Sequence, residues 1–123
     1  MKIILSIKPQ YCDEIFAGEK RFEYRRKMFK RSVESVLVYA TSPICKIVGE
    51  FEIDRVLEDT PESLWMQTSR YGGISHKSYS DYFHDTDTAY ALAISNYIRY
   101  NKPLDPKSLD RNFVAPQSYR YLE

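Results

Sequence analysis

A short polar stretch near the N-terminus combines the functional groups that recognise phosphates and nucleobase edges. Residues 18–31 read GEKRFEYRRKMFKR, with Lys20, Glu23 and Arg25 following Gly18 at offsets of two, five and seven. An ammonium group presents a point charge to a phosphate, and a guanidinium presents a planar fork of donors. A carboxylate accepts hydrogen bonds from base amino groups or takes part in proton transfer. These residue types predict a site for RNA or for a nucleotide.

The same stretch interleaves cations with aromatic side chains. Seven basic and two acidic residues between positions 19 and 31 give this segment a charge of +5, whereas the whole chain carries +1. A single-stranded nucleic acid needs cations for its phosphates and flat side chains for its unstacked bases. The residues that we predict to bind RNA or a nucleotide are Lys8, Lys20, Glu23, Tyr24, Arg25 and Arg26.

Two alternatives compete with simple binding at these residues. A ribonuclease that needs no metal requires a base and an acid around the 2′-hydroxyl and the leaving oxygen. Lys20 and Glu23 are the catalytic candidates if burial lowers the pKa of the lysine. In the simpler alternative, Glu23 and Arg25 form a surface ion pair that contributes less than about 1 kcal/mol. His76 and His84 are better explained as surface or packing residues, and we expect neither a metal nor a cofactor.

The elements around the motif follow from the hydrophobic pattern. Residues 2–7 alternate as a strand that ends at Lys8, and Pro9 suits the first turn of a helix. Gly18 is a natural helix terminator because glycine tolerates a positive φ. Residues 21–25 then alternate again as a strand. The predicted site therefore lies at a junction between a helix and a strand.

The rest of the chain predicts an α+β fold. Strands are expected at 35–40, 46–56 and 88–100, and the second of these bends at Gly49. Residues 115–122 could add an edge strand. Helices are expected after Thr60 and at 75–83. Tyr119 and Tyr121 are predicted to pack at the C-terminus, with contact to RNA as the alternative. Because the strands come in adjacent runs, this order favours a small mixed β-barrel with peripheral helices over a doubly wound sheet.

Length and composition agree with one folded unit. The 123 residues suffice for a single domain over 1–123, and no run of about 18 apolar residues predicts a membrane span. The apolar run at 3–7 is too short for a signal peptide, so we expect a cytoplasmic protein. Cys12 and Cys45 lack metal-type spacing and are predicted to be buried thiols.

The opening LSIKPQYCDEIFAGEKRFEYRR resembles the ASCH domain, a branch of the PUA-like superfamily. The signature of that family is Gly-x-Lys-x-x-Glu-x-Arg, which Gly18, Lys20, Glu23 and Arg25 match. The segment IVGEFEIDRV and the terminal PQSYRYL are also similar to the family. The resemblance implies a small PUA-like β-barrel whose cleft is lined by the motif and binds RNA or a modified nucleotide.

The resemblance also leaves the activity open. Some members of the family look like ribonucleases or hydrolases, and an acetylcytidine amidohydrolase branch uses a lysine, a threonine and a glutamate. Lys20 matches that lysine, but Glu23 stands where the threonine is expected. Thr41 or Ser42 would replace the missing hydroxyl only if the fold brings one of them to Lys20. A protein-interaction adaptor that uses the acidic segment 46–62 is the third possibility.

Overall fold

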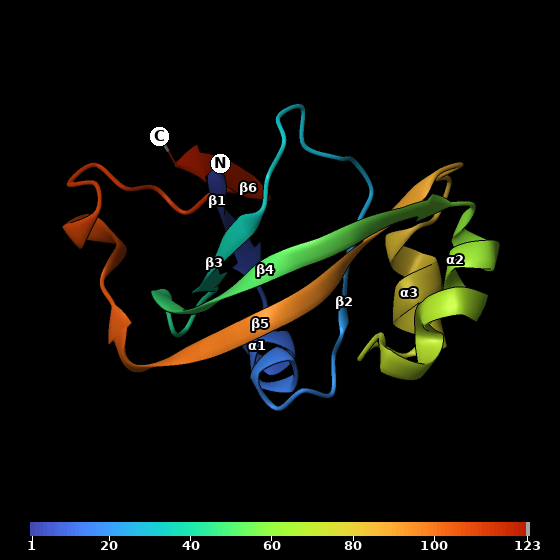
Figure 1. Ribbon diagram of the computed structural model, residues 1–123, viewed down its shortest axis with the longest axis horizontal. Helices are drawn as coiled ribbons and strands as arrows, with labels where there is room; N and C mark the ends of the chain where they lie inside the picture. Colours follow the sequence, from blue (N-terminus) through green and yellow to red (C-terminus); the bar gives the residue numbers. More distant parts are fainter. Residues whose placement is uncertain (123) are drawn as a thin grey trace.

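The strands of the computed structural model form one six-stranded mixed sheet in the order β2-β5-β4-β3-β1-β6 (Figure 1). The structure describes residues 1–122. The strands are β1 (Lys2–Ile7), β2 (Phe22–Arg25), β3 (Ser35–Ala40), β4 (Lys46–Asp59), β5 (Ala89–Leu104) and β6 (Tyr119–Leu122). The helices are α1 (Pro9–Phe16), α2 (Pro61–Thr68) and α3 (His76–Tyr82), with short 3-10 turns η1 (Ser69–Tyr71) and η2 (Pro106–Ser108). β1 pairs in parallel with β3, and the other neighbouring strands pair antiparallel.

The sheet curls into a half-barrel with the helices outside it, which confirms the predicted α+β class and mixed barrel. The edge strands β2 and β6 approach each other where Nη1 of Arg25 donates a hydrogen bond to Oγ of Ser118, at 3.1 Å. The long strand β4 bends at Gly49, where its register with both neighbouring strands shifts. A Cβ at Gly49 would lie 2.4 Å from the Ile98 carbonyl oxygen and from the Phe16 ring. Glycine is therefore required at this bend.

Two apolar clusters hold the elements in place. The first joins α1 to the middle of the sheet, with Ile3, Ile15 and Phe51 almost completely buried. The second joins β2 and β5 to α2 and α3 through Tyr24, Leu64, Tyr79, Phe83 and Ala91. Side chains on both faces of β2 are thereby enclosed, which places this short strand between α1 and the α2–α3 layer (Figure 1).

The predicted elements are present, with differences at their ends. β5 continues to Leu104, beyond the predicted end at position 100, because its pairing with β4 extends to Ile47. Cys12 is buried as predicted, but the same prediction for Cys45 is wrong. Cys45 lies in the β3–β4 turn, where its backbone has a φ of 54° and its side chain faces solvent. Within residues 1–122, no helix is long and apolar enough to cross a membrane.

Candidate functional site

A pocket of about 220 Å³ opens where the end of β1, the start of α1, β2 and α3 meet. Its lining residues are Ser6, Ile7, Lys8, Tyr11, Lys20, Glu23, Tyr24, Arg25, Ile74, Ser78 and Tyr82. We call it the Lys20 pocket. Five of the six residues predicted from the sequence line it, and Arg26 lies outside, in a neighbouring hollow. Thr41 and Ser42 are not among its lining residues.

The Lys20 side chain is directed inward by the end of α1. Gly18 adopts a φ of 78°, and the Lys20 backbone N–H then donates to the carbonyl oxygen of Glu14. The side chain is only 2% exposed, and its Nζ donates to the carbonyl oxygen of Gly72. Nζ also lies 5.0 Å from the centre of the Tyr11 ring and 5.1 Å from that of Tyr24. An ammonium group over aromatic faces is held electrostatically.

Two glycines allow the α2–α3 connection to approach this lysine. A Cβ at Gly73, where φ is 64°, would lie 2.9 Å from Cβ and Cγ of Lys20. A Cβ at Gly72 would lie 2.3 Å from the Tyr24 hydroxyl oxygen. These two glycines therefore form part of the wall around Lys20.

Burial lowers the pKa of the Lys20 ammonium, while the carboxylates of Glu23 and Glu14 oppose that shift. The folded chain thus binds this proton more weakly than the unfolded chain, so stability is gained as pH rises toward the ordinary lysine pKa of about 10.4. Lys20→Met keeps most of the length of the side chain and removes the titration. We expect the unfolding free energy of the wild type to increase, relative to that of Lys20→Met, between pH 7 and pH 10. Urea unfolding across that range measures the difference, and a constant difference would contradict the prediction.

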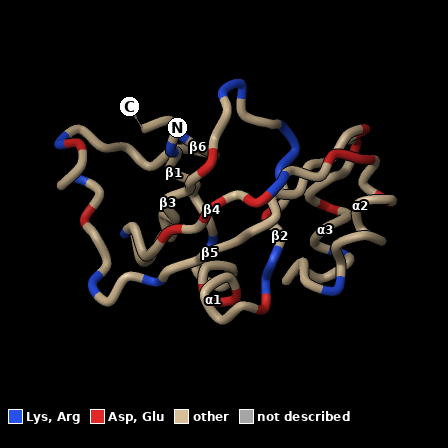
Figure 2. Tube along the Cα trace, viewed as in Figure 1, with Lys and Arg blue, Asp and Glu red and all other residues tan. Residues whose placement is uncertain are grey.

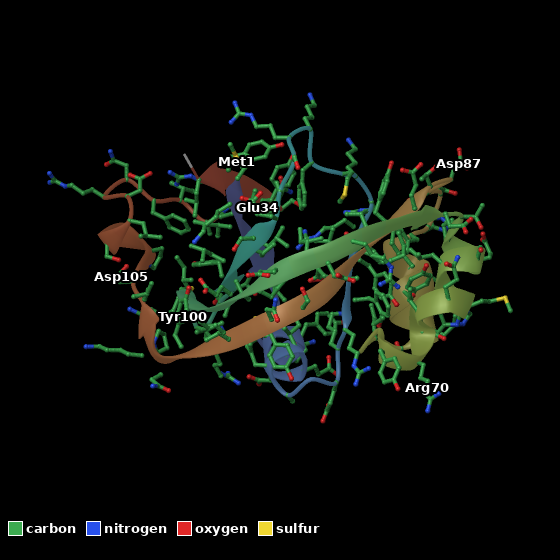
Figure 3. All side chains as sticks on the ribbon, viewed as in Figure 1. Met1, Glu34, Arg70, Asp87, Tyr100 and Asp105 are labelled. Carbon is green, nitrogen blue, oxygen red and sulfur yellow. The ribbon has the colours of Figure 1, made fainter. Side chains whose placement is uncertain are left out.

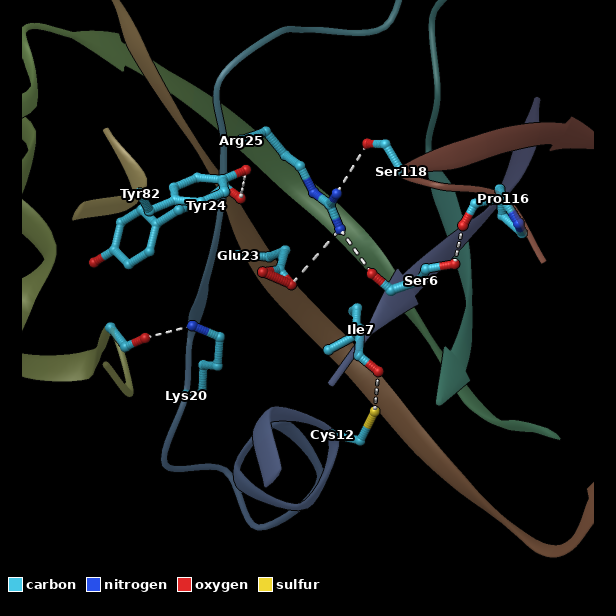
Figure 4. A network of polar contacts seen from close by, with 11 residues as sticks. Ser6, Ile7, Cys12, Lys20, Glu23, Tyr24, Arg25, Tyr82, Pro116 and Ser118 are labelled. Atoms are coloured by element: carbon cyan, nitrogen blue, oxygen red, sulfur yellow. Dashed lines mark hydrogen bonds and ion pairs between the residues drawn. The ribbon is translucent and has the colours of Figure 1, made fainter. Parts of the chain in front are cut away.

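Glu23 and Arg25 form a buried pair beside Lys20. Oε2 of Glu23 lies 4.0 Å from Nη2 of Arg25, and the two residues are only 8% and 9% exposed. Nη2 also contacts the carbonyl oxygen of Ser6 at 3.5 Å. Figure 4 shows Glu23 between Arg25 and Lys20. The alternative of a surface ion pair is therefore wrong, because the fold encloses both side chains.

This pair keeps unused hydrogen-bonding capacity. Oε2 of Glu23 and Nε of Arg25 are buried and have no hydrogen-bond partner among the residues that the structure describes. Native proteins leave few buried polar atoms unsatisfied, and each such atom calls for an explanation. Both side chains line the Lys20 pocket, so a polar ligand there would reach groups that the protein itself does not satisfy.

Tyrosines form the apolar wall of the pocket. The Tyr24 hydroxyl forms a 2.7 Å hydrogen bond with Oγ1 of Thr68, and its ring packs edge-on against Tyr79 at 4.9 Å. Burial raises the pKa of Tyr24. The Tyr82 hydroxyl donates to the Tyr24 carbonyl oxygen at 3.3 Å. These contacts fix the rings around the site.

Sequence reasoning missed several lining residues because they lie outside the motif. Tyr11 belongs to α1 and Tyr82 to α3, and only the fold brings them together. The abundance of tyrosine was the single signal, and it did not select these two among eleven. His76 and His84 lie elsewhere: His76 packs on Trp65 with ring centres 5.0 Å apart, and His84 pairs with Asp85 at 3.3 Å.

Basic residues gather along β2 and the loop that follows it (Figure 2). Arg26 stacks over the Tyr82 ring with its guanidinium 4.7 Å from the ring centre. Arg21, at the other end of β2, stacks over Tyr71 at 4.1 Å. The Lys20 pocket therefore lies between cations that are held against aromatic rings.

Comparison with known proteins agrees with this fold. A protein of Zymomonas mobilis named ASCH domain-containing ribonuclease is 28% identical over 126 aligned residues, which cover 97% of this chain and 82% of that protein. The crystal structure of ASCH from Zymomonas mobilis superposes with a TM-score of 0.92 at 25% identity, covering 99% of this chain and 87% of that one.

A second relative is much longer than this chain. A protein of Ureaplasma parvum named ATP synthase subunit alpha is 33% identical over 122 residues, which cover 98% of this chain but only 15% of that protein. The ASCH domain family model matches residues 5–99, which include the whole Gly18–Arg25 motif. The chain therefore belongs to the ASCH domain family.

Proposed function

We propose that the chain binds RNA or a nucleotide in the Lys20 pocket. The observation that carries the proposal is the buried Glu23–Arg25 pair, because each member lines the pocket and retains an unsatisfied polar atom. A phosphate accepts hydrogen bonds from Arg25, and a base amino group donates to Glu23. Lys20 adds a second cation from the opposite side of Glu23 (Figure 4).

The size and walls of the pocket support the binding of one part of a nucleotide. Its volume of about 220 Å³ is below the roughly 300–1,000 Å³ typical of pockets for drug-sized molecules. One base or one sugar-phosphate unit is the matching size. Tyr11, Tyr24 and Tyr82 supply ring surface on which a base can stack. Lys8 is exposed at the rim, where it suits an electrostatic contact with an approaching phosphate.

Cleavage of RNA without a metal is the second candidate, which the name of the Zymomonas relative and the Lys20–Glu23 pair favour. In this reaction the Glu23 carboxylate takes the 2′-hydroxyl proton, and the freed oxygen attacks the adjacent phosphorus. The bond from phosphorus to the 5′-oxygen breaks, and Lys20 donates a proton to that leaving oxygen. The products are a 2′,3′-cyclic phosphate and a 5′-hydroxyl end. Burial lowers the pKa of Lys20, which makes its ammonium group a stronger acid than that of an exposed lysine.

The other sequence-based alternatives receive less support. An amidohydrolase mechanism needs a hydroxyl nucleophile, and neither Thr41 nor Ser42 lines the pocket. The adaptor hypothesis concerns the acidic segment 46–62, which forms β4 and the start of α2, and it stays a prediction.

Lys20→Met tests the binding proposal. We expect the affinity for single-stranded RNA to fall, and the slope of log K against log salt to decrease by about 0.7, because one phosphate contact is lost. Fluorescence anisotropy at several salt concentrations measures both values. Lys102→Met removes an exposed lysine from the distal part of β5 and serves as the control. Equal affinity and slope in Lys20→Met and the wild type would refute the role of Lys20.

A further inference from the structure

A second hollow adjoins the Lys20 pocket on the side of β6. It has a volume of about 580 Å³. Its lining residues are Arg25, Arg26, Lys27, Tyr82, Asp85, Thr86, Ser118 and Tyr119. Arg25 and Tyr82 line both cavities, so the two adjoin at these residues. We call the second cavity the outer hollow.

The outer hollow has the chemistry of a polyanion site. Its lining includes three cations from the end of β2 and the residues after it, and one carboxylate, that of Asp85. That carboxylate faces the imidazole of His84 at 3.3 Å. Two aromatic side chains, Tyr82 and Tyr119, also line the hollow. Arg26 stacks over Tyr82 at 4.7 Å, and Tyr119 packs edge-on against Phe29 at 4.8 Å. A flat base thus meets ring surface and cations together.

Arg25 marks the boundary between the two cavities. The residue is only 9% exposed, and its Nε has no hydrogen-bond partner among residues 1–122. Its Nη1 donates to Ser118 and its Nη2 contacts Ser6. These two contacts anchor the guanidinium and leave further N–H donors at the point that a ligand filling both cavities must cross.

We propose that the outer hollow is a second nucleotide subsite and that the ligand is a single-stranded oligonucleotide, not a free nucleoside. The base of one nucleotide occupies the Lys20 pocket, the neighbouring nucleotide occupies the outer hollow, and the phosphate that links the two nucleotides lies against Arg25. This inference rests on the proposed function of the Lys20 pocket. A base that enters the small Lys20 pocket must leave its stack, which a single strand permits at much lower cost than a duplex.

The test compares ligands of increasing length on the intact chain. The probes are the four nucleoside 5′-monophosphates and mixed-sequence dinucleotides and tetranucleotides, with 2′-fluoro groups that prevent cleavage. We expect dinucleotides to bind at least about tenfold more tightly than the best mononucleotide, because a second stacked base and a linking phosphate are added. Isothermal titration calorimetry gives each affinity.

Charge variants test whether the higher affinity for dinucleotides depends on the outer hollow. Lys27 is exposed, and Lys27→Glu is expected to remove most of the gain for dinucleotides while leaving mononucleotide affinity within about twofold. Asp85→Asn, which suits the positive φ of 56° at that position, is expected to tighten dinucleotide binding. The matched control is Lys102→Glu, because Lys102 is also exposed. Lys102 lies two residues beyond Tyr100, and Figure 3 shows Tyr100 at the end of the molecule away from Arg70 and Asp87.

The possible outcomes separate this inference from the function on which it rests. Equal affinity for mononucleotides and dinucleotides would overturn the second subsite and leave the Lys20 pocket as a nucleotide site. An equal loss in Lys27→Glu and Lys102→Glu would overturn the assignment to the outer hollow. Absence of binding by every probe would overturn both proposals.

Discussion

Glu23→Gln is expected to slow the cleavage of single-stranded RNA by about 10²–10⁴-fold if the Lys20 pocket is catalytic. The amide has nearly the same shape as the carboxylate, but it cannot take the 2′-hydroxyl proton. The substitution also removes the charge that faces the buried Arg25 guanidinium at 4.0 Å, so we expect the variant to be less stable than the wild type. Circular dichroism identifies conditions in which the variant is folded, and under these conditions we expect it to bind RNA while its turnover is lost.

The measurement is single-turnover cleavage of a labelled oligonucleotide, with the affinity measured in parallel. Glu19→Gln makes the same chemical change at an exposed position four residues earlier and is the matched control. A cyclic phosphate at the new 3′ end identifies the reaction. If wild-type protein and Glu23→Gln cleave equally fast, Glu23 is not the base. If neither wild type nor variants cleave, binding alone remains as the function of the pocket.

Arg25→Ala is expected to lower the unfolding free energy by about 3–5 kcal/mol and to weaken RNA binding at least about tenfold. The loss of stability follows because the variant leaves the Glu23 carboxylate buried without its cation, and also removes the link from β2 to Ser118. The loss of affinity follows because a charge-assisted hydrogen bond contributes roughly 1.5–3 kcal/mol.

A second substitution separates these two causes. In Glu23→Gln/Arg25→Ala both members of the buried pair lose their charge, so we expect the double variant to be more stable than Arg25→Ala alone. Arg25→Lys keeps the charge but loses the planar fork, and it is expected to restore less than full affinity. Urea unfolding followed by circular dichroism gives the stabilities. A single and a double variant of equal stability would show that the buried pair is not the source of the effect.

The helices and strands of this protein can be predicted from its sequence because they depend on residues a few positions apart. Alternation at 2–7 and 21–25 reflects the period of a strand, and Pro9 and Gly18 bound α1 by their own backbone preferences. The motif from Gly18 to Arg25 is also local, so five of the six predicted binding residues line one pocket. The roles of these residues remain predictions.

Long-range contacts decide the burial and the hydrogen-bond partners of those residues. The carbonyl oxygen that receives the Lys20 hydrogen bond belongs to Gly72, 52 positions later, and the hydroxyl that holds Arg25 belongs to Ser118, 93 positions later. No local pattern encodes such partners. Sequence reasoning therefore left open whether Glu23 and Arg25 form a surface ion pair or belong to a binding site.

What the sequence by itself determined is the order of the elements and the chemical groups placed at the helix-to-strand junction, because propensity and side-chain period act over short distances. Only the tertiary structure decided that these groups are enclosed. The curl of the sheet brings the β2 and β6 edges together, and the α2–α3 layer closes over Lys20. Removal of these charges from water lowers the pKa of Lys20 and leaves atoms of Glu23 and Arg25 without hydrogen-bond partners among the described residues. These are the properties that make the charged segment a candidate site.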